Sequence, residues 1–296
     1  TVVISTPPQG AEACAADPIM DLLELGFRTL DEWSVFFRTM RPGIESQRAQ
    51  ALDRIAIEGL HDPYLGLVTP DRIELDSARL RESLIAHSCT SRTRAILHVL
   101  RTYACGREKS LRVFASERLS PFAQRLRSIF PRFTGSEYLP LASDRRAHPR
   151  VMHQDVQALS FSDDSFDIYV SCEVLEHVPD MDRAISEAAR ILKPGGLFVG
   201  TVPFNMRGTE RTIKARLGPD GLEHLAPPEY HGNPTRPDEG SLVFAIPGWD
   251  FVQDLERAGF EDAGMRFVMS GYFGLLTNDV GGVFLFAARK PVKPAA

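Results

Sequence analysis

From Leu111 onward, short apolar runs alternate with segments that carry apolar residues at helical spacing. The runs are typical of buried strands, and the segments between them are typical of helices with one apolar face. Strands are expected at "LRVFA" (111–115), "TGSEYLP" (134–140), "VMHQDV" (151–156), "FDIYVSC" (166–172), "LFVGTVPF" (197–204), "AGMRFVMS" (263–270) and "GGVFLFAARK" (281–290). This alternation predicts an α/β fold: a seven-stranded sheet with helices on both faces.

Three helices are expected between these strands, at "SPFAQRLRSIF" (120–130), "DMDRAISEAARIL" (180–192) and "GWDFVQDLERAGF" (248–260). Ser120 is the expected N-cap of the first, with Pro121 at its first helical position. About a hundred residues precede the first core strand, and helices are expected there over 18–40, 46–60 and 89–104. The predicted organisation is a flexible terminus (1–18), an N-terminal helical cap (19–108), and an α/β domain (109–296) with an insertion at 205–245.

Composition narrows the class of function. The chain has 296 residues and a net charge of −5, which gives no basic face for nucleic acid. No apolar run approaches the roughly 20 residues needed to cross a bilayer, and the first residues lack the pattern of a secretion signal. The four cysteines have neither zinc-site nor disulfide-scaffold spacing. We therefore expect a cytoplasmic protein that acts on a small molecule, as a monomer or homodimer, without nucleic-acid or membrane partners.

Ligands of open α/β sheets bind beyond the carboxyl ends of the strands, near the point where the strand order reverses. The residues that directly follow each strand are therefore the candidate site. They are Ala115, Ser116 and Glu117, then Glu137 and Tyr138, then Asp155, then Ser171 to His177, and finally Pro203 to Asn205.

Residues 153–204 contain an acidic residue, "LSF", "FDIYV", "CEVLEHV" and "LKPGG" in that order. This pattern resembles the class I S-adenosylmethionine-dependent methyltransferases of type 11. The resemblance covers residues 110–205 well and 245–290 loosely. It implies a Rossmann-like sheet, S-adenosylmethionine as the cofactor, and methyl transfer to an O or N atom of a small molecule.

The resemblance also implies roles for single residues. Glu137 would accept hydrogen bonds from both ribose hydroxyls, with a solvated surface Glu as the alternative. Asp155 would contact the exocyclic amine of adenine beside the backbone of Val156, with an Asx-type turn as the alternative. Cofactor contacts are expected from Ala115, Ser116, Glu117, Glu137, Tyr138, Asp155, Val156, Cys172, Glu173 and His177. For His177, packing against the cofactor and general-base catalysis both remain open.

The first turn departs from this family, because "VFASERLSP" (113–121) has no glycine where Gly-x-Gly-x-Gly is usual. S-adenosylmethionine has no phosphate for a glycine-rich loop to hold. Glu117 is expected to pair with the ammonium of the cofactor, while amides near Ser120 receive its carboxylate. The chain is similar to an atypical bacterial subgroup through "ASERLSP", "GSEYLP" and "PPEYHGNP".

The insertion contains "RTIKARLGPDGLEHLAPPEYHGNP" (211–234), in a region that commonly covers the acceptor in this fold. His224 and His231, together with His177, are the candidate catalytic bases, because imidazole titrates near neutrality. The alternative is a set of surface histidines. The spacing of His224, Glu229 and His231 matches no ligand signature, so no resident metal is expected.

These observations favour an enzyme, an S-adenosylmethionine-dependent methyltransferase. Two alternatives remain: a protein that binds S-adenosylmethionine for other chemistry, such as cyclisation, and a pseudoenzyme that serves as an interaction module.

Overall fold

The computed structural model describes residues 21–292, so the expected flexible terminus (1–18) lies outside the described residues. The chain divides into two compact units. One contains the described residues up to Glu108 together with Gly264–Leu285, and the other contains Lys109–Ala263 and the residues from Phe286. Strands β17 (Glu261–Met269) and β18 (Val283–Arg289) each pass from one unit into the other.

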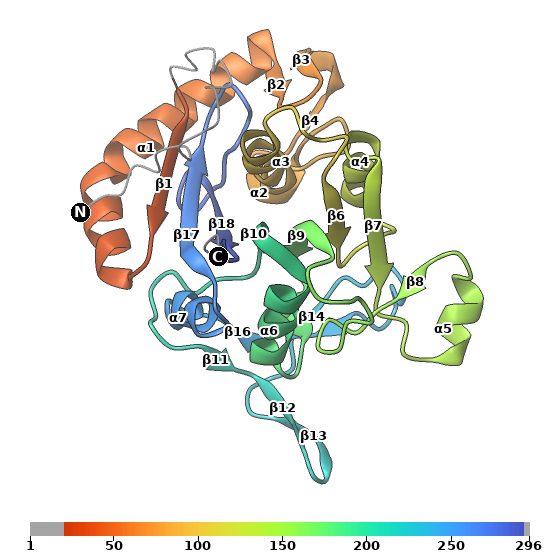
Figure 1. Cartoon of the computed structure of the whole chain (residues 1–296). Coiled ribbons are helices and arrows are strands. Elements are labelled where there is room, and N and C mark those ends of the chain that lie inside the picture. The colour runs from red at the N-terminus through yellow and green to blue at the C-terminus, as the bar shows by residue number, and fades with distance from the viewer. Residues whose placement is uncertain (1–20, 293–296) are drawn as a thin grey trace. The chain divides into compact units, whose positions relative to one another are not determined.

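The sheet of the second unit carries the predicted strands in the order β18-β10-β9-β6-β7-β8 (Figure 1). Strands β6 to β10 run parallel to one another, and β18 is antiparallel to β10. Their bounds are β6 (Arg112–Ala115), β7 (Arg132–Glu137), β8 (Met152–His153), β9 (Phe166–Cys172) and β10 (Leu192–Thr201). The predicted α/β class is confirmed.

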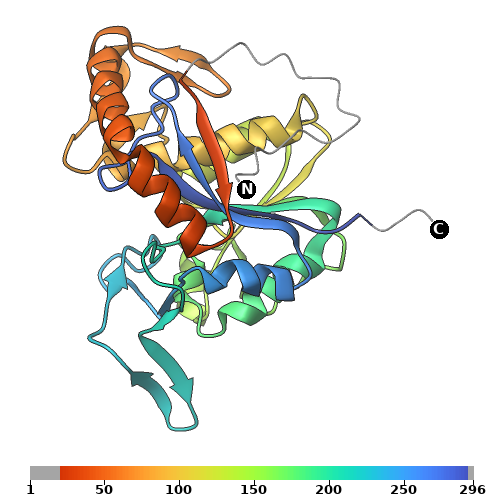
Figure 2. The ribbon, with the colours of Figure 1, turned by 90° about the vertical axis from the view of Figure 1, so that its left-hand side faces the viewer.

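Helices α4 (Pro121–Ile129) and α6 (Met181–Ile191) connect parallel strands of this sheet. In the sheet, β7 lies on one side of β6, whereas β10 lies on the opposite side of β9. Since such crossovers are right-handed, the two helices cover opposite faces. Helix α7 (Asp250–Arg257) contacts α6 on its face (Figure 2). The strand order therefore reverses between β6 and β9, where a ligand crevice is expected.

Helix α4 begins where its sequence predicts. The Oγ of Ser120 accepts a hydrogen bond from the amide of Ala123 at 2.9 Å, and Pro121 is the first helical residue. Phe122, Ala123 and Leu126 form its buried face. Helix α6 starts in the same way at Asp180, and the short helix α5 (Ala142–Ala147) follows β7.

The first unit differs from the prediction at its start. Residues 23–27, expected within a helix over 18–40, form strand β1 (Leu23–Phe27), which pairs antiparallel with β17. Helix α1 (Leu30–Glu58) begins after the N-cap Thr29 and continues through Pro42, so the helices expected over 18–40 and 46–60 are one helix beside β1 (Figure 2). Strand β17 beside β18, and β1 beside β17, extend the sheet to eight strands, one more than expected.

The rest of this unit surrounds α3 (Ser91–Ala104), which lies within the range predicted for a helix. Arg94 on α3 is fully buried, and its guanidinium donates to the carbonyls of Leu84, Cys89, Phe273 and Gly274. Two of these acceptors come from the C-terminal segment of the unit. The smaller elements are β2 (Leu60–Asp62), β3 (Gly66–Val68), η1 (Pro70–Arg72), β4 (Ile73–Leu75), α2 (Leu80–Ser83) and β5 (Leu84–Ala86).

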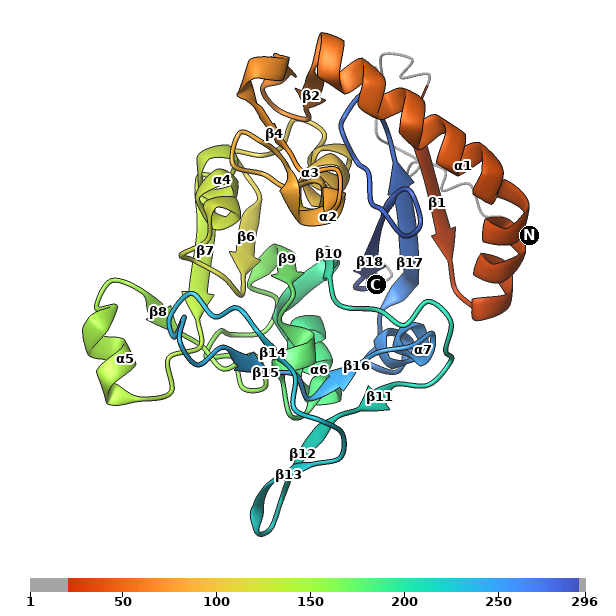
Figure 3. The ribbon, with the colours of Figure 1, turned by 180° about the vertical axis from the view of Figure 1, so that it is seen from behind.

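The predicted insertion is folded into three small two-stranded pieces. These are β11 (Thr212–Ile213) with β16 (Ala245–Ile246), β12 (Ala215–Gly218) with β13 (Gly221–His224), and β14 (Tyr230–His231) with β15 (Ser241–Leu242). The β12–β13 hairpin projects from the rest of its unit (Figure 3). Among residues 21–292, no helix has the length and apolar character that a membrane crossing requires.

Candidate functional site

The turn after β6 lies at the reversal of strand order. The amide of Ser116 donates to the carbonyl of Val170 on β9 at 3.3 Å, and the hydroxyls of Ser116 and Ser171 lie 3.5 Å apart. Ala115, Ser116 and Ser171 are buried. The structure thus brings together the strand ends that the sequence places in the site.

Glu137 ends β7 and holds this turn. Its Oε1 accepts hydrogen bonds from the amides of Arg118 at 2.8 Å and Leu119 at 2.9 Å. The residue is only 8 % exposed, so it is not the solvated surface Glu that was the alternative. Among residues 21–292, no side chain or amide is hydrogen-bonded to its Oε2.

Gly135 gives the glycine-free turn its room. A Cβ at Gly135 would lie 2.7 Å from the carbonyl oxygen of Glu117 and 2.9 Å from Cδ of Arg118. Within residues 115–120, no residue has a positive φ, so the turn itself needs no glycine for its backbone conformation. The close approach therefore depends on a glycine in the neighbouring strand.

Glu117 is tied to the start of α4. Its carboxylate accepts a hydrogen bond from the hydroxyl of Ser120, which in turn accepts from the amide of Ala123. The chain thereby fixes the position of the Glu117 side chain beside the helix start. Pairing of this carboxylate with a cofactor ammonium stays a prediction.

Asp155 forms an Asx-type turn, the alternative to its expected contact with adenine. Its Oδ1 accepts from the amide of Gln157 at 2.9 Å and from the side chain of Gln157 at 3.1 Å. Val156 next to it is buried. Tyr138 is 59 % exposed, and partial burial together with the charge of Asp155 raises the pKa of its phenol. The contacts of Asp155 and Val156 with adenine, and of Tyr138 with the cofactor, stay predictions.

The segment after β9 turns sharply at Cys172 and Glu173. Glu173 has φ 53°, a left-handed conformation, and its amide donates to the carbonyl of Thr201 at 2.9 Å. The short helix η2 (Leu175–His177) follows. His177 is half-buried, and its Nδ1 donates to the carbonyl of Leu242 at 2.9 Å. This bond fixes the ring and leaves Nε2 as the nitrogen with a lone pair.

His231 comes from strand β14 of the insertion and faces η2. Its Nδ1 lies 3.6 Å from Oε1 of Glu176, and its Nε2 lies 3.0 Å from Oε1 of Glu229. Interaction with Glu176, and also with Glu229, outweighs burial and raises the pKa of His231 to about 9. Glu229 also pairs with Lys214. The ring of His231 stands edge-on to that of His177, with centroids 5.1 Å apart.

Glu176 lies inside "CEVLEHV" and within the candidate range Ser171 to His177, but the sequence predicts no role for it. It is fully buried, and its carboxylate faces both imidazoles. Among residues 21–292, Glu176, His177 and His231 form a group that could hold a metal ion. One ligand atom from each lies within 4.8 Å of the ligand atoms of the other two. We call these three residues the Glu-His-His cluster.

His224 is not part of this cluster. It is exposed on the β12–β13 hairpin, where it pairs with Ala215 across the two strands. Of the three histidines predicted as candidate bases, the structure brings together His177 and His231.

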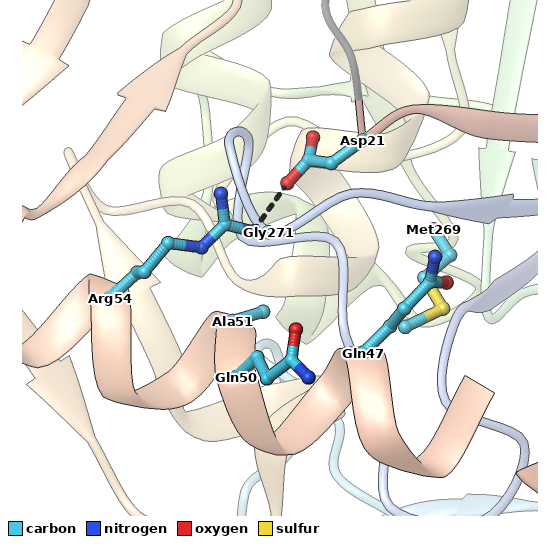
Figure 4. A pocket seen from close by; sticks show the side chains of 7 residues that line it. All are labelled: Asp21, Gln47, Gln50, Ala51, Arg54, Met269 and Gly271. Carbon is cyan, nitrogen blue, oxygen red and sulfur yellow. Dashed lines mark hydrogen bonds and ion pairs between the residues drawn. The ribbon is translucent and has the colours of Figure 1, made fainter. Parts of the chain in front are cut away.

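A cavity of about 330 Å³ lies in the first unit, between α1 and the segment after β17 (Figure 4). Asp21 and Arg54 form an ion pair at 3.0 Å on its wall. Its other lining residues are Gln47, Gln50, Ala51, Met269 and Gly271. No residue predicted for the site from the sequence lines this cavity.

Comparison with known proteins finds a methyltransferase match within the second unit. Residues 121–200 match the family model described as a methyltransferase domain. A ubiquinone biosynthesis O-methyltransferase of Methylococcus capsulatus is 31 % identical over 147 residues, which are 48 % of this chain and 57 % of that protein. An uncharacterized methyltransferase of Mycobacterium tuberculosis is 39 % identical over 97 residues, 30 % of this chain and 36 % of that protein. The matches thus span between about a third and a little over half of these relatives.

Among solved structures, an S-adenosylmethionine-dependent methyltransferase of Mesorhizobium loti has a TM-score of 0.40 at 18 % identity, covering 62 % of this chain and 92 % of that one. A Burkholderia thailandensis 1,6-didemethyltoxoflavin-N1-methyltransferase has a TM-score of 0.39 at 16 % identity, covering 68 % and 78 %. The resemblance predicted from the motifs is confirmed by the family match over residues 121–200.

Proposed function

We propose that this chain is an S-adenosylmethionine-dependent methyltransferase that acts on an O or N atom of a small molecule. One observation carries the proposal: the buried carboxylate of Glu137 holds the turn at the reversal of strand order, beside a segment that matches a methyltransferase domain. When bound, S-adenosylmethionine supplies an electrophilic methyl group on its sulfonium and leaves as S-adenosylhomocysteine.

The residues at this edge suit such a cofactor. One oxygen of Glu137 is occupied by two backbone amides, which fixes the carboxylate, and the other oxygen can accept from a ribose diol. Because the side chain is buried, water competes weakly for it. Glu137 therefore both shapes the turn and offers the acceptor that a ribose needs.

An acceptor that carries O–H or N–H must lose a proton when it is methylated, and two histidines stand near this edge. His177 donates from Nδ1 to Leu242, so its Nε2 can accept a proton. His231 lies between two carboxylates and remains protonated at neutral pH. We assign proton acceptance to His177 and orientation of the acceptor to His231, whereas the exposed His224 takes no part.

The relatives favour an oxygen as the methylated atom, since the Methylococcus protein is an O-methyltransferase by name. A cytoplasmic location and a monomeric or homodimeric state remain predictions from the sequence.

Calorimetric titration with S-adenosylhomocysteine tests the proposal. We expect binding well below millimolar concentration, and a loss of at least tenfold in affinity in Glu137→Ala, about 1.4 kcal/mol. The exposed Glu261→Ala is the matched control. A folded chain that gives no heat at about 1 mM ligand would be an interaction module rather than an enzyme.

Transfer of label separates methylation from other chemistry. Incubation of the protein and methyl-labelled S-adenosylmethionine with a metabolite extract should give a labelled small molecule. Binding of the cofactor without such transfer would favour a reaction that uses its sulfonium differently, such as cyclisation.

A further inference from the structure

We infer that the Glu-His-His cluster is a binding site for a divalent transition-metal ion, with Zn²⁺ as the best-suited ion. Glu176 and His177 follow β9, and His231 comes from the insertion, so two segments distant in sequence build the site. This inference goes beyond the proposed methyl transfer, and its test requires no methyl donor.

The distances within the cluster suit a shared ion. Nε2 of His177 lies 3.5 Å and Nδ1 of His231 lies 3.6 Å from the same oxygen, Oε1 of Glu176. Both distances are too long for good hydrogen bonds. Ligands bound tetrahedrally at about 2.0–2.1 Å from Zn²⁺ lie roughly 3.3 Å from one another, which is close to the separations seen here.

The carboxylate of Glu176 faces the two imidazoles without a hydrogen bond to either. The side chain is fully buried, and neither of its oxygens has a hydrogen-bond partner among the described residues. Burial of a carboxylate without hydrogen bonds is costly. The residue cannot easily turn away, because its backbone carbonyl accepts from the amide of Phe244 at 2.7 Å. A cation between Glu176 and the two imidazoles would remove this cost.

The surroundings hold each imidazole with one nitrogen directed at Glu176. The other nitrogen of His177 donates to the carbonyl of Leu242 at 2.9 Å, and that of His231 lies 3.0 Å from Glu229. Glu229 is itself paired with Lys214. Metal-bound histidines are characteristically fixed in this way, by a carbonyl or carboxylate on the nitrogen that does not bind the metal.

The ligand types select the ion. Two imidazoles and one carboxylate suit Zn²⁺ or Fe²⁺, whereas Mg²⁺ prefers an all-oxygen shell. Three protein ligands also leave at least one coordination position for water or an acceptor oxygen. Metal ligation and proton acceptance by His177 use the same lone pair, so a metal-loaded protein would hold the acceptor through the ion instead.

The test is a titration of the full-length chain, treated with chelator, with ZnCl₂ as the only ligand. We expect one Zn²⁺ per chain and at least a hundredfold loss of affinity in His231→Ala and in Glu176→Gln, which keeps the shape of the side chain. His224→Ala is the matched control and should bind as the unchanged protein does. Replacement by Co²⁺ should give the visible absorption of a tetrahedral site.

Two results would overturn the inference. One is the absence of Zn²⁺ binding by a folded chain at about 1 mM, which would mean that a proton on His231 alone balances Glu176. The other is equal Zn²⁺ affinity in the unchanged protein and in His231→Ala. A chain that binds S-adenosylhomocysteine but not Zn²⁺ contradicts only this inference, and the reverse contradicts only the proposed function.

Discussion

Gly135 decides how closely the turn after β6 can lie against β7. In Gly135→Ala the new Cβ would meet the backbone carbonyl of Glu117 at 2.7 Å, so the turn must move. We expect S-adenosylhomocysteine to bind at least tenfold more weakly, about 1.4 kcal/mol, by calorimetry. Gly218→Ala is the control, since its nearest atom would be 3.8 Å away. Unchanged affinity in a folded Gly135→Ala protein would show that the turn tolerates the shift.

Glu137 is expected to contribute to stability as well as to binding. Glu137→Ala removes the acceptor of two part-buried amides, those of Arg118 and Leu119, and should lower the free energy of unfolding by about 2–4 kcal/mol. Glu137→Gln keeps one acceptor oxygen and should lose less than half of that. Urea unfolding measures both. A cost under about 0.5 kcal/mol for Glu137→Ala would contradict this account, since surface substitutions commonly cost that little.

The site residues could be predicted from the sequence where strand ends define them. Glu137 and Ser116 were found because the carboxyl ends of parallel strands share one edge. Glu176 lies in the predicted range Ser171 to His177, but its burial and role could not be predicted, because a Glu beside a His in a short helix has no pattern that reveals burial. Its partner His231 meets it only through the docking of the insertion, which no local pattern encodes.

Among the elements, β1 is expected to make stability depend on acid. Burial would raise the pKa of Glu24, but its hydrogen bonds and charge interactions with His98 and Arg266 outweigh burial and lower that pKa from 4.5. A carboxyl whose pKa is lowered on folding stabilises the protein above its unfolded pKa. That contribution is lost as the pH falls through the folded value.

We therefore expect Tm to fall as the pH drops below about 4.5, and to fall less steeply in Glu24→Gln. Thermal unfolding followed by circular dichroism across this range measures both slopes. Glu45→Gln is the control, because Glu45 forms an exposed pair with Arg41 on α1. Equal slopes in the unchanged protein and Glu24→Gln would remove Glu24 from the explanation.

The prediction of elements failed at β1 for a physical reason. Leu23, Leu25 and Phe27 alternate with other residues, as a strand requires, but they also fit the apolar spacing of the helix that follows. Pairing with β17, more than 200 residues away, decides between the two. The short strands of the insertion were missed because two to four residues carry no readable period.

At the scale of the whole molecule, the first unit should not fold without its C-terminal segment. Strand β1 pairs with β17, and two of the four carbonyls that accept from Arg94 belong to Phe273 and Gly274. A fragment of residues 21–108 would leave the Arg94 charge without these acceptors. We expect circular dichroism of this fragment to show little cooperative unfolding, whereas the full chain unfolds cooperatively. A cooperative transition in the fragment would contradict this.

The α/β fold class was predictable because the alternation of strands and helices is a local pattern. Which segments make up each compact unit could not be predicted in this way. The boundary predicted near residue 108 coincides with the end of the first segment of the first unit. That unit, however, also contains Gly264–Leu285. Only three-dimensional pairing reveals that the chain returns.

The room that Gly135 gives to the turn has a consequence for evolution. In this chain the position that requires glycine is Gly135 on strand β7. The turn after β6 can therefore contain Ser, Glu and Arg instead of glycines. In related proteins, we expect the glycine at 135, the residue at 137 and the sequence of the turn after β6 to change together. A search that requires glycines within the loop would overlook all of them.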